Sequence, residues 1–457
     1  MTWIDDHFLL TNNLGKRLYH EFVVGEPICD RHSHLDPHDF AHDRRFENLY
    51  ELWLVGDHYK WRAMRAAGIS EHYITGPASP FEKFSAWSAT VPKLLGNALH
   101  HWTHLELLRL FGVSELLDET SASEIWDQTN SLLADPSFST QGIFRFLGVQ
   151  SFCTTDDPAD DLAGHVAALQ CSAPTRMYPT FRPDKALAIT HRPMFLDWVR
   201  RLESASRVSI ACLDDLLIAL GRRHAAFHDA GCRSSDHGLP YCYAEMCHES
   251  IAHTVFDKVM TGHPLTDLEV RQFRSFMMEY FARLDAKAGW TMQLHLGALR
   301  NNNSRLFAAL GPDCGADSIG DWPQAVALGR FLDRMDRDGE LPRMVIYVLN
   351  PTEYYAVATM LGNFQGSEIA GKLRFGAAWW FLDHADGITQ QLQVVMQTGL
   401  LAYSGGMVTD ARSYASMVRH EYFRRVVCDF LGREMHAGRL PPHLDVIGPL
   451  ARTLALN

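Results

Sequence analysis

Eight short apolar segments, most of them ending on a polar side chain, constrain the fold of this 457-residue chain more than any other feature. They cover residues 27–34, 147–157, 176–182, 232–237, 291–296, 344–350, 373–380 and 401–410. Between several of them, as in 213–227 and 322–335, apolar residues recur every three or four positions, which indicates amphipathic helices. Strands that alternate with helices favour a parallel α/β fold, and eight such units predict a (β/α)8 TIM barrel.

The residues at the ends of the predicted strands have side chains that can take part in catalysis or bind a ligand. They are His34, Asp156, Arg182, His237, His295, Asn350, Trp380 and Asp410. In a (β/α)8 barrel the carboxyl ends of all strands meet at one mouth, where the active site forms. The sequence therefore predicts one site built from side chains that lie far apart along the chain.

Residues 37–142 separate the first two predicted strands, which is too long for a simple connection. The segment has helical periodicity and dispersed tryptophans, among them Trp53, Trp61, Trp87 and Trp102. We expect an α-helical insertion that covers the barrel mouth, with the barrel itself formed by 1–36 and 143–457.

The motif His32-Ser33-His34 is the strongest local signal for a metal site. In a strand, residues i and i+2 point to the same face, so both imidazoles could bind one divalent metal ion. His295 and Asp410 are candidates for further ligands, and Asp410 could also act as a base. The alternatives are a hydrogen-bonded buried histidine for His295 and a helix N-cap for Asp410.

The formal charge of −12, from 42 basic and 54 acidic residues, makes a nucleic-acid partner unlikely for this chain. An anionic substrate would be repelled by the molecule as a whole and would need local cations. Arg182 and Arg412 follow predicted strands and could hold a carboxylate through a bidentate guanidinium, although ion pairing on the surface is the alternative.

The location of the protein is predicted from its N-terminus, its apolar runs and its cysteines. Residues 1–22 carry charged side chains such as Asp5 and Lys16 and lack the apolar core of a signal peptide. No run approaches the ~18 apolar residues of a membrane span. The nine cysteines are an odd number, are scattered and form no CxxC, which is typical of free thiols in a reducing compartment. We expect a cytoplasmic protein without a membrane partner.

Several segments together resemble the uronate isomerase (glucuronate isomerase) family of the amidohydrolase superfamily. HxH is shared across that superfamily, whereas the Gln-Leu-His and Arg-Asn-Asn-Asn segment is more specific. The matching segments run in family order from about residue 27 to 430, and they include Asp30-Arg31-His32-Ser33-His34, Gln293-Leu294-His295, Arg300-Asn301-Asn302-Asn303, Trp379-Trp380-Phe381 and Thr409-Asp410-Ala411-Arg412-Ser413.

The resemblance implies a distorted barrel of the metal-dependent hydrolase type with a helical insertion after the first strand. It implies one metal ion, usually zinc in this family, held by His32, His34 and Asp410, with His295 nearby. It places the substrate-contacting residues at His58, Tyr59, Arg182, Arg412 and either Trp379 or Trp380. The superfamily's binuclear hydrolases commonly carry a carboxylated lysine after strand four, and none of the eight lysines of this chain lies there, which agrees with a single metal.

The activity that the resemblance implies is an aldose–ketose isomerisation in hexuronate catabolism. D-glucuronate would become D-fructuronate, and D-galacturonate would become D-tagaturonate, by proton transfer through a cis-enediol. Asp410 is the first choice as base, with His58 and Tyr59 as proton shuttles. The alternatives are a metal-dependent hydrolase of the same superfamily acting on a lactone or amide, and a non-catalytic sugar-acid sensor. The partner would be a small hexuronate, and barrels of this kind usually form homo-oligomers.

Overall fold

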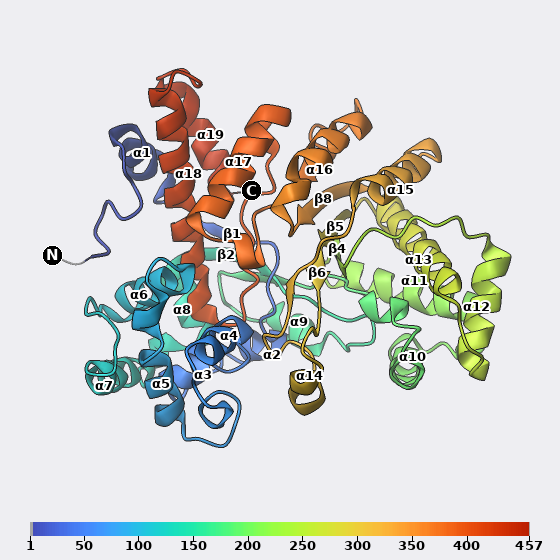
Figure 1. Cartoon of the computed structure of the whole chain (residues 1–457), viewed down its shortest axis with the longest axis horizontal. Coiled ribbons are helices and arrows are strands. Elements are labelled where there is room, and N and C mark those ends of the chain that lie inside the picture. Colours follow the sequence, from blue (N-terminus) through green and yellow to red (C-terminus); the bar gives the residue numbers. More distant parts are fainter. Residues whose placement is uncertain (1–2, 457) are drawn as a thin grey trace.

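Parallel strands lie at the centre of the molecule, and helices surround them (Figure 1). The computed structural model describes residues 3–456. One parallel sheet has the order β1-β2-β3, with β1 (Ile28–Asp30), β2 (Val149–Cys153) and β3 (Arg176–Tyr178). A second parallel sheet has the order β4-β5-β8-β9, with β4 (Ser234–Leu239), β5 (Thr291–Leu296), β8 (Arg343–Val348) and β9 (Leu373–Phe375). The predicted parallel α/β fold is therefore confirmed.

A short antiparallel pair, β6 (Ala298–Leu299) and β7 (Ser318–Ile319), was not predicted. Seven of the eight predicted segments contain a recorded strand, but 401–410 does not. Residues Leu401–Tyr403 form a 3-10 helix, and beyond it Gly405 packs so closely on the backbone that a Cβ there would lie 2.7 Å from the Cα of Gly376. The glycines let the segment run beside β9 without regular strand geometry.

Helices with one buried face follow the strands of the second half of the chain. The predicted helices at 213–227 and 322–335 are confirmed as α11 (Leu213–Asp229) and α15 (Ala325–Arg337). A reciprocal side-chain cap between Thr266 and Glu269 begins α13 (Asp267–Ala288), and Gly289 at a φ of 68° ends it. The remaining helices outside 37–147 are α1 (Asn13–Leu18), α9 (Ala163–Ala168), α10 (Arg192–Ser206), α12 (Glu249–Thr261), α13 (Asp267–Ala288), α14 (Ser304–Leu310), α16 (Tyr354–Leu361), α17 (Ala385–Thr398), α18 (Arg419–His436) and α19 (Leu444–Leu456).

The segment between β1 and β2 is helical and packs around its own buried aromatic side chains, among them Trp53, Phe84 and Trp87. In Figure 1 most of its helices gather on one side of the strands, opposite α10 to α13. An ion pair of 2.8 Å between Arg109 and Glu421 joins it to α18. Its helices are α2 (Pro37–Ala41), α3 (Leu49–Trp53), α4 (His58–Ala66), α5 (Pro80–Ser88), α6 (Ala98–Phe111), α7 (Ala122–Leu133) and α8 (Thr140–Leu147).

The strands are buried on both faces, as parallel strands covered by helices are. Five of the six residues of β5 are buried. Among residues 3–456, no helix combines the length and the hydrophobicity that crossing a membrane requires.

Candidate active site

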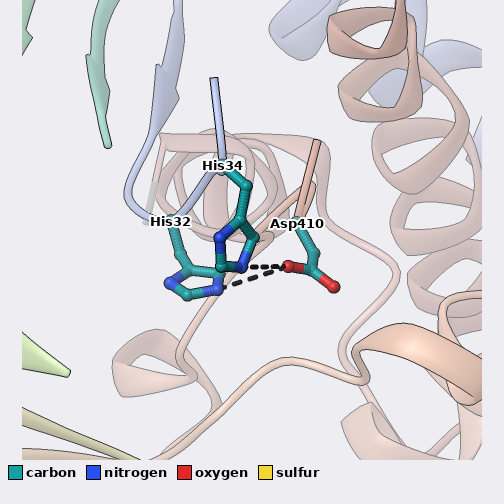
Figure 2. A group of neighbouring side chains, drawn as sticks. All are labelled: His32, His34 and Asp410. Atoms are coloured by element: carbon teal, nitrogen blue, oxygen red, sulfur yellow. Dashed lines mark ion pairs between the residues drawn. The ribbon is translucent and has the colours of Figure 1, made fainter. Parts of the chain in front are cut away.

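Two histidines and one aspartate meet where the chain leaves β1 (Figure 2). The backbone holds them together, because the amide of His34 donates to the carbonyl of Ala411 at 2.8 Å and the amide of Asp410 donates to the carbonyl of His32 at 3.2 Å. Asp410 Oδ1 lies 3.4 Å from His32 Nε2 and 3.0 Å from His34 Nε2. Segments almost 380 residues apart in sequence thus form one polar cluster.

Asp410 has a φ of 49°, the left-handed region that non-glycine residues rarely adopt and that clusters at functional sites. Although burial acts to raise it, the pKa of Asp410 is held well below its usual range by hydrogen bonds from His32 and His34 and by the charge of Arg412. Burial and the charge of Arg412 lower the pKa of His34 to about 3. The cluster therefore combines an ionised carboxylate with a neutral imidazole at His34.

This donor set fits a divalent metal ion. One nitrogen from each of His32 and His34 and one oxygen from Asp410 all lie within 4.8 Å of one another. Ligands about 2.0–2.1 Å from a tetrahedral zinc are separated by about 3.3–3.4 Å, close to the distances between these atoms. His34 and Asp410 are in the protonation states that bind a metal, whereas the carboxylates of Asp236 and Asp410 raise the pKa of His32 despite its burial.

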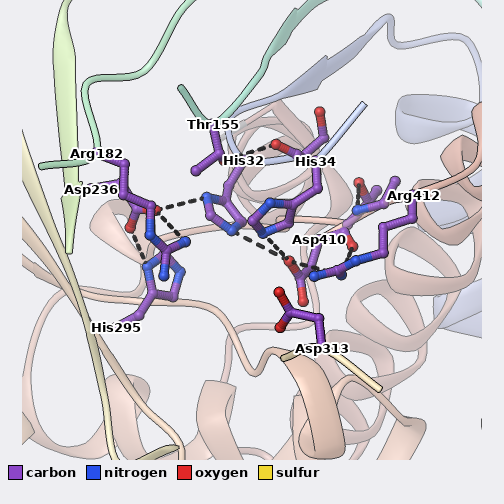
Figure 3. Close-up of polar contacts among 12 residues, drawn as sticks. His32, His34, Thr155, Arg182, Asp236, His295, Asp313, Asp410 and Arg412 are labelled. Atoms are coloured by element: carbon purple, nitrogen blue, oxygen red, sulfur yellow. Dashed lines mark hydrogen bonds and ion pairs between the residues drawn. The ribbon is translucent and has the colours of Figure 1, made fainter. Parts of the chain in front are cut away.

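A second polar group lies on the side of His32 away from Asp410 and centres on Asp236 of β4 (Figure 3). Asp236 Oδ1 lies 2.6 Å from His295 Nδ1, and its Oδ2 lies 3.0 Å from Arg182 Nη1 and 3.6 Å from His32 Nδ1. The pKa of the fully buried Asp236 lies well below its usual range because the charges of Arg182, His295 and His32 outweigh burial. Asp236 thus orients two histidines while Arg182 balances its charge.

The α4 helix brings two side chains of the inserted segment to the cluster. Asp57 caps the helix by accepting from the amides of Tyr59 and Lys60, which fixes where His58 and Tyr59 begin it. The Tyr59 hydroxyl donates to Asp410 Oδ2 at 2.9 Å, and the His58 ring stacks on Tyr59 with centroids 5.0 Å apart. Burial and the charge of Arg412 lower the pKa of His58 to about 4.

The cluster lines a cavity of about 450 Å³, a volume typical of small-molecule sites. Five buried polar atoms of its lining residues have no hydrogen-bond partner among the described residues: His32 Nδ1, His58 Nε2, Asp184 Oδ1, His295 Nε2 and Trp379 Nε1. Buried polar atoms normally find partners, so unpaired atoms on this wall fit a cavity that receives a polar ligand. The predicted site residues on the wall are His32, His34, His58, Arg182, His295, Trp379, Trp380, Asp410 and Arg412.

The tenth predicted residue, Tyr59, lines a neighbouring cavity of about 720 Å³ and reaches the cluster through its hydroxyl. Among the other predicted strand ends, Asp156 also lines the smaller cavity. Asn350 instead caps a 3-10 helix that begins at Pro351.

The whole chain, residues 1–457, matches the family model described as glucuronate isomerase. The chain belongs to the glucuronate isomerase family. The uronate isomerase of Solibacter usitatus is 48% identical over 454 residues, which cover 99% of this chain and 97% of that protein. The expected family is confirmed, and the chain is an enzyme.

Solved structures agree with this membership. A crystal structure of uronate isomerase from Thermotoga maritima superposes with a TM-score of 0.94 at 34% identity, covering 99% of this chain and 98% of that one. A crystal structure of glucuronate isomerase from Caulobacter crescentus gives 0.92 at 25% identity, covering 99% and 95%. The comparisons favour isomerisation over the alternative hydrolase activity.

The two arginines of this glucuronate isomerase family member differ in what already binds them. Arg182 donates to Asp184 at 2.9 Å and to Asp236 at 3.0 Å. Within residues 3–456, Arg412 has only a 3.4 Å contact with the carbonyl of Asp410 and a 3.8 Å approach to its carboxylate. Arg412 therefore keeps more of its five donors for a ligand.

Two side chains in the cavity region were not singled out from the sequence. The predicted residue at the end of β4 was His237, but His237 is buried against Phe281 and contacts Ser235 Oγ at 3.1 Å. Strand alternation could have indicated Asp236 instead, because Asp236 and Gly238 share the face that turns toward Arg182. Arg300 lies over the Trp380 ring at 4.6 Å, a contact that needs the fold to bring the two together.

The N-cap alternative for Asp410 is wrong, since the next helical turn begins at Tyr414 and is capped by Ser413. The buried-histidine alternative for His295 holds for its Nδ1, which is hydrogen-bonded to Asp236. Its Nε2 has no hydrogen-bond partner in the described part of the chain.

Proposed function

We propose that this enzyme interconverts D-glucuronate with D-fructuronate, and D-galacturonate with D-tagaturonate, in the 450 Å³ cavity. The observation that carries the proposal is one wall on which an ionised carboxylate, Asp410, lies beside a guanidinium with unused donors, Arg412. The first can remove a proton and the second can hold a substrate carboxylate. Family membership supplies the class of substrate.

The isomerisation moves one hydrogen from C2 to C1 of the open-chain aldose. Asp410 removes the C2 proton while O1 gains a proton, which gives a cis-enediol. O2 then loses its proton and C1 gains one, which gives the ketose. Tyr59, whose hydroxyl lies 2.9 Å from Asp410, and His58 beside it are placed to carry protons between the two oxygens.

We propose that His32, His34 and Asp410 hold one divalent metal ion, most simply zinc, and that His295 lies beside that site. Such an ion would polarise the substrate oxygens as a Lewis acid when bound. Asp236 fixes the ring of His295 through the bond to Nδ1, which leaves Nε2 facing the cavity. That nitrogen is placed to hydrogen-bond a substrate hydroxyl.

Exchanging His34 for Asn should lower the metal content of the purified enzyme from about one ion per chain to well below half, because one of three proposed ligands is lost. Elemental analysis of protein prepared without added metal measures this. His42, which bonds a backbone carbonyl on α2 and lies outside the cavity, provides the control variant His42→Asn. Unchanged metal content in His34→Asn would show that the ion is bound elsewhere.

Of the two tryptophans, we propose that Trp379 contacts the substrate. Its Nε1 is buried beside the cavity and has no hydrogen-bond partner among residues 3–456. The Trp380 ring, in contrast, stacks on Phe381 and has the Arg300 guanidinium 4.6 Å from its centroid. Trp379→Phe should raise the KM for glucuronate by about 5- to 15-fold, because one hydrogen bond worth about 1–1.5 kcal/mol is lost. Trp380→Phe keeps the ring stack and should change KM less than Trp379→Phe. The reverse order in steady-state kinetics would assign the contact to Trp380.

We propose a distorted (β/α)8 barrel, 1–36 and 143–457, with 37–142 as an insertion over its mouth. Isolated parallel bridges support closure, because Phe181 pairs with Ser235 between the two sheets and Ser33 pairs with Ala411 beside β1. Gly405 also donates to the carbonyl of Phe375 of β9 at 2.9 Å. Tyr59 supports the position of the insertion through its bond to Asp410.

We further propose a homo-oligomer located in the cytoplasm, where uronate catabolism would take place.

The direct test is to incubate the purified enzyme with D-glucuronate, with D-galacturonate and with a panel of lactones, each with and without a chelator. We expect ketose from at least one uronate, a lower rate after chelation and recovery on adding zinc. Hydrolysis of a lactone without ketose from either uronate would favour the hydrolase instead.

A further inference from the structure

A further cavity of about 520 Å³, lined by both charged and apolar residues, lies at the other end of the strands. Ser234 and Thr291, the first residues of β4 and β5, line it, whereas His295 near the end of β5 lines the active-site cavity. Its wall also includes Tyr347 and Gln293, which are joined by a hydrogen bond of 2.9 Å. The Tyr347 ring stacks on His295 at 4.2 Å, so one layer of side chains separates the two cavities.

Three arginines line this cavity, and no acidic residue among the described part of the chain does. Within residues 3–456, none of Arg31, Arg233 and Arg374 has a carboxylate oxygen within the 4.0 Å of an ion pair. Their recorded hydrogen bonds go to backbone carbonyls, those of Leu456 for Arg31, of His228 and Cys232 for Arg233, and of Gly371 for Arg374.

Just over half of the arginines of this chain of charge −12 form an ion pair with an acidic side chain, as Arg109, Arg182 and Arg334 do, whereas these three form none in the described part of the chain. Burial lowers the pKa of Arg374, and the nearby charges of Arg31, on the same cavity wall, and of Arg343, outside it, lower it further. Unbalanced cations around a cavity attract anions, and a guanidinium binds a phosphate or carboxylate with two parallel hydrogen bonds.

We propose that this cavity binds a small phosphate monoester, with Arg31, Arg233 and Arg374 around the phosphate and the hydroxyls of Ser234 and Thr291 near its polyol part. A phosphate monoester carries up to two negative charges and three acceptor oxygens, which matches three guanidinium groups better than a single carboxylate does. The volume of about 520 Å³ leaves room for a body of sugar size beyond the phosphate.

Calorimetric titration of the full-length enzyme at low ionic strength tests this, with glycerol 3-phosphate as the probe and glycerate and glycerol as its carboxylate and neutral counterparts. We expect one glycerol 3-phosphate site per chain, weaker binding of glycerate and none of glycerol. The double variant R233Q/R374Q should lose affinity at least about tenfold, since two charge-assisted donors are removed. R200Q, an exposed arginine on α10 outside the cavity, should bind as the wild type does.

R412M separates this cavity from the active site and should keep the affinity for glycerol 3-phosphate. Unchanged isomerase activity of R233Q/R374Q without the probe would show that it folds, and the single variants R233Q and R374Q carry the same prediction should the double variant not fold. The proposal is overturned by absent binding to the wild type, by equal binding of glycerate, or by loss of binding in R412M but not in R233Q/R374Q.

Discussion

Replacing Asp410 by Asn should lower kcat for glucuronate by at least about 10³-fold and should stop the exchange of the C2 hydrogen with deuterated water. General-base catalysis contributes about 10²–10⁴-fold, and an amide cannot accept the proton. Asp410 is also a proposed metal ligand, so its loss removes two functions at once. The fold should survive, because Asn has nearly the same volume and the bonds that hold the segment come from the backbone of 410 and 411.

The measurements are ketose formation, C2–H exchange followed by proton NMR, and circular dichroism to verify folding. Asp160→Asn is the matched control, because Asp160 lines the same cavity but pairs with Arg201, away from the histidines. Exchange at a near-normal rate in Asp410→Asn, with the control also normal, would assign the base to another residue.

Replacing Arg412 by Met should weaken the binding of glucuronate about 30-fold while changing the binding of neutral D-glucose much less. A charge-assisted hydrogen bond to a carboxylate is worth about 2 kcal/mol, and Arg412 has unused donors that point to such a role. Methionine keeps the apolar stem, so the comparison isolates the guanidinium.

Inhibition constants for glucuronate and D-glucose, measured on the wild type and on Arg412→Met, give the loss of affinity for each sugar. Arg300→Met is a useful control, since Arg300 also lines the cavity but already contacts Asp317 at 3.1 Å and the Trp380 ring. An equal loss of affinity for glucuronate and glucose in Arg412→Met would remove Arg412 as the carboxylate anchor.

The sequence sufficed where local pattern decides the structure. Strand alternation predicted that His32 and His34 point the same way, and both rings do lie against Asp410, although β1 ends at Asp30 and 401–410 is not a strand. Helical periodicity located α11 and α15 closely. These features depend on neighbours along the chain, which a single sequence displays directly.

Contacts between distant segments could not be predicted in the same way. Nothing in the composition of α4 indicates that Tyr59 reaches Asp410, and only the family resemblance marked it. Arg182 and Arg412 look alike in sequence, but the partners that occupy Arg182 come from β4 and from Asp184. The irregular course of 401–410 depends on the close approach of Gly405 to Gly376, which periodicity cannot reveal.

Proton transfer to and from carbon is the central chemical step proposed for this site, and one experiment tests it most directly. Proton NMR of D-glucuronate incubated with the wild-type enzyme in deuterated water follows the C2 hydrogen as the ketose forms. We expect D-fructuronate to appear with deuterium at C1 in a measurable fraction of the product. Unchanged substrate, or ketose that retains the original hydrogen in every molecule, would contradict proton transfer through an exchangeable base.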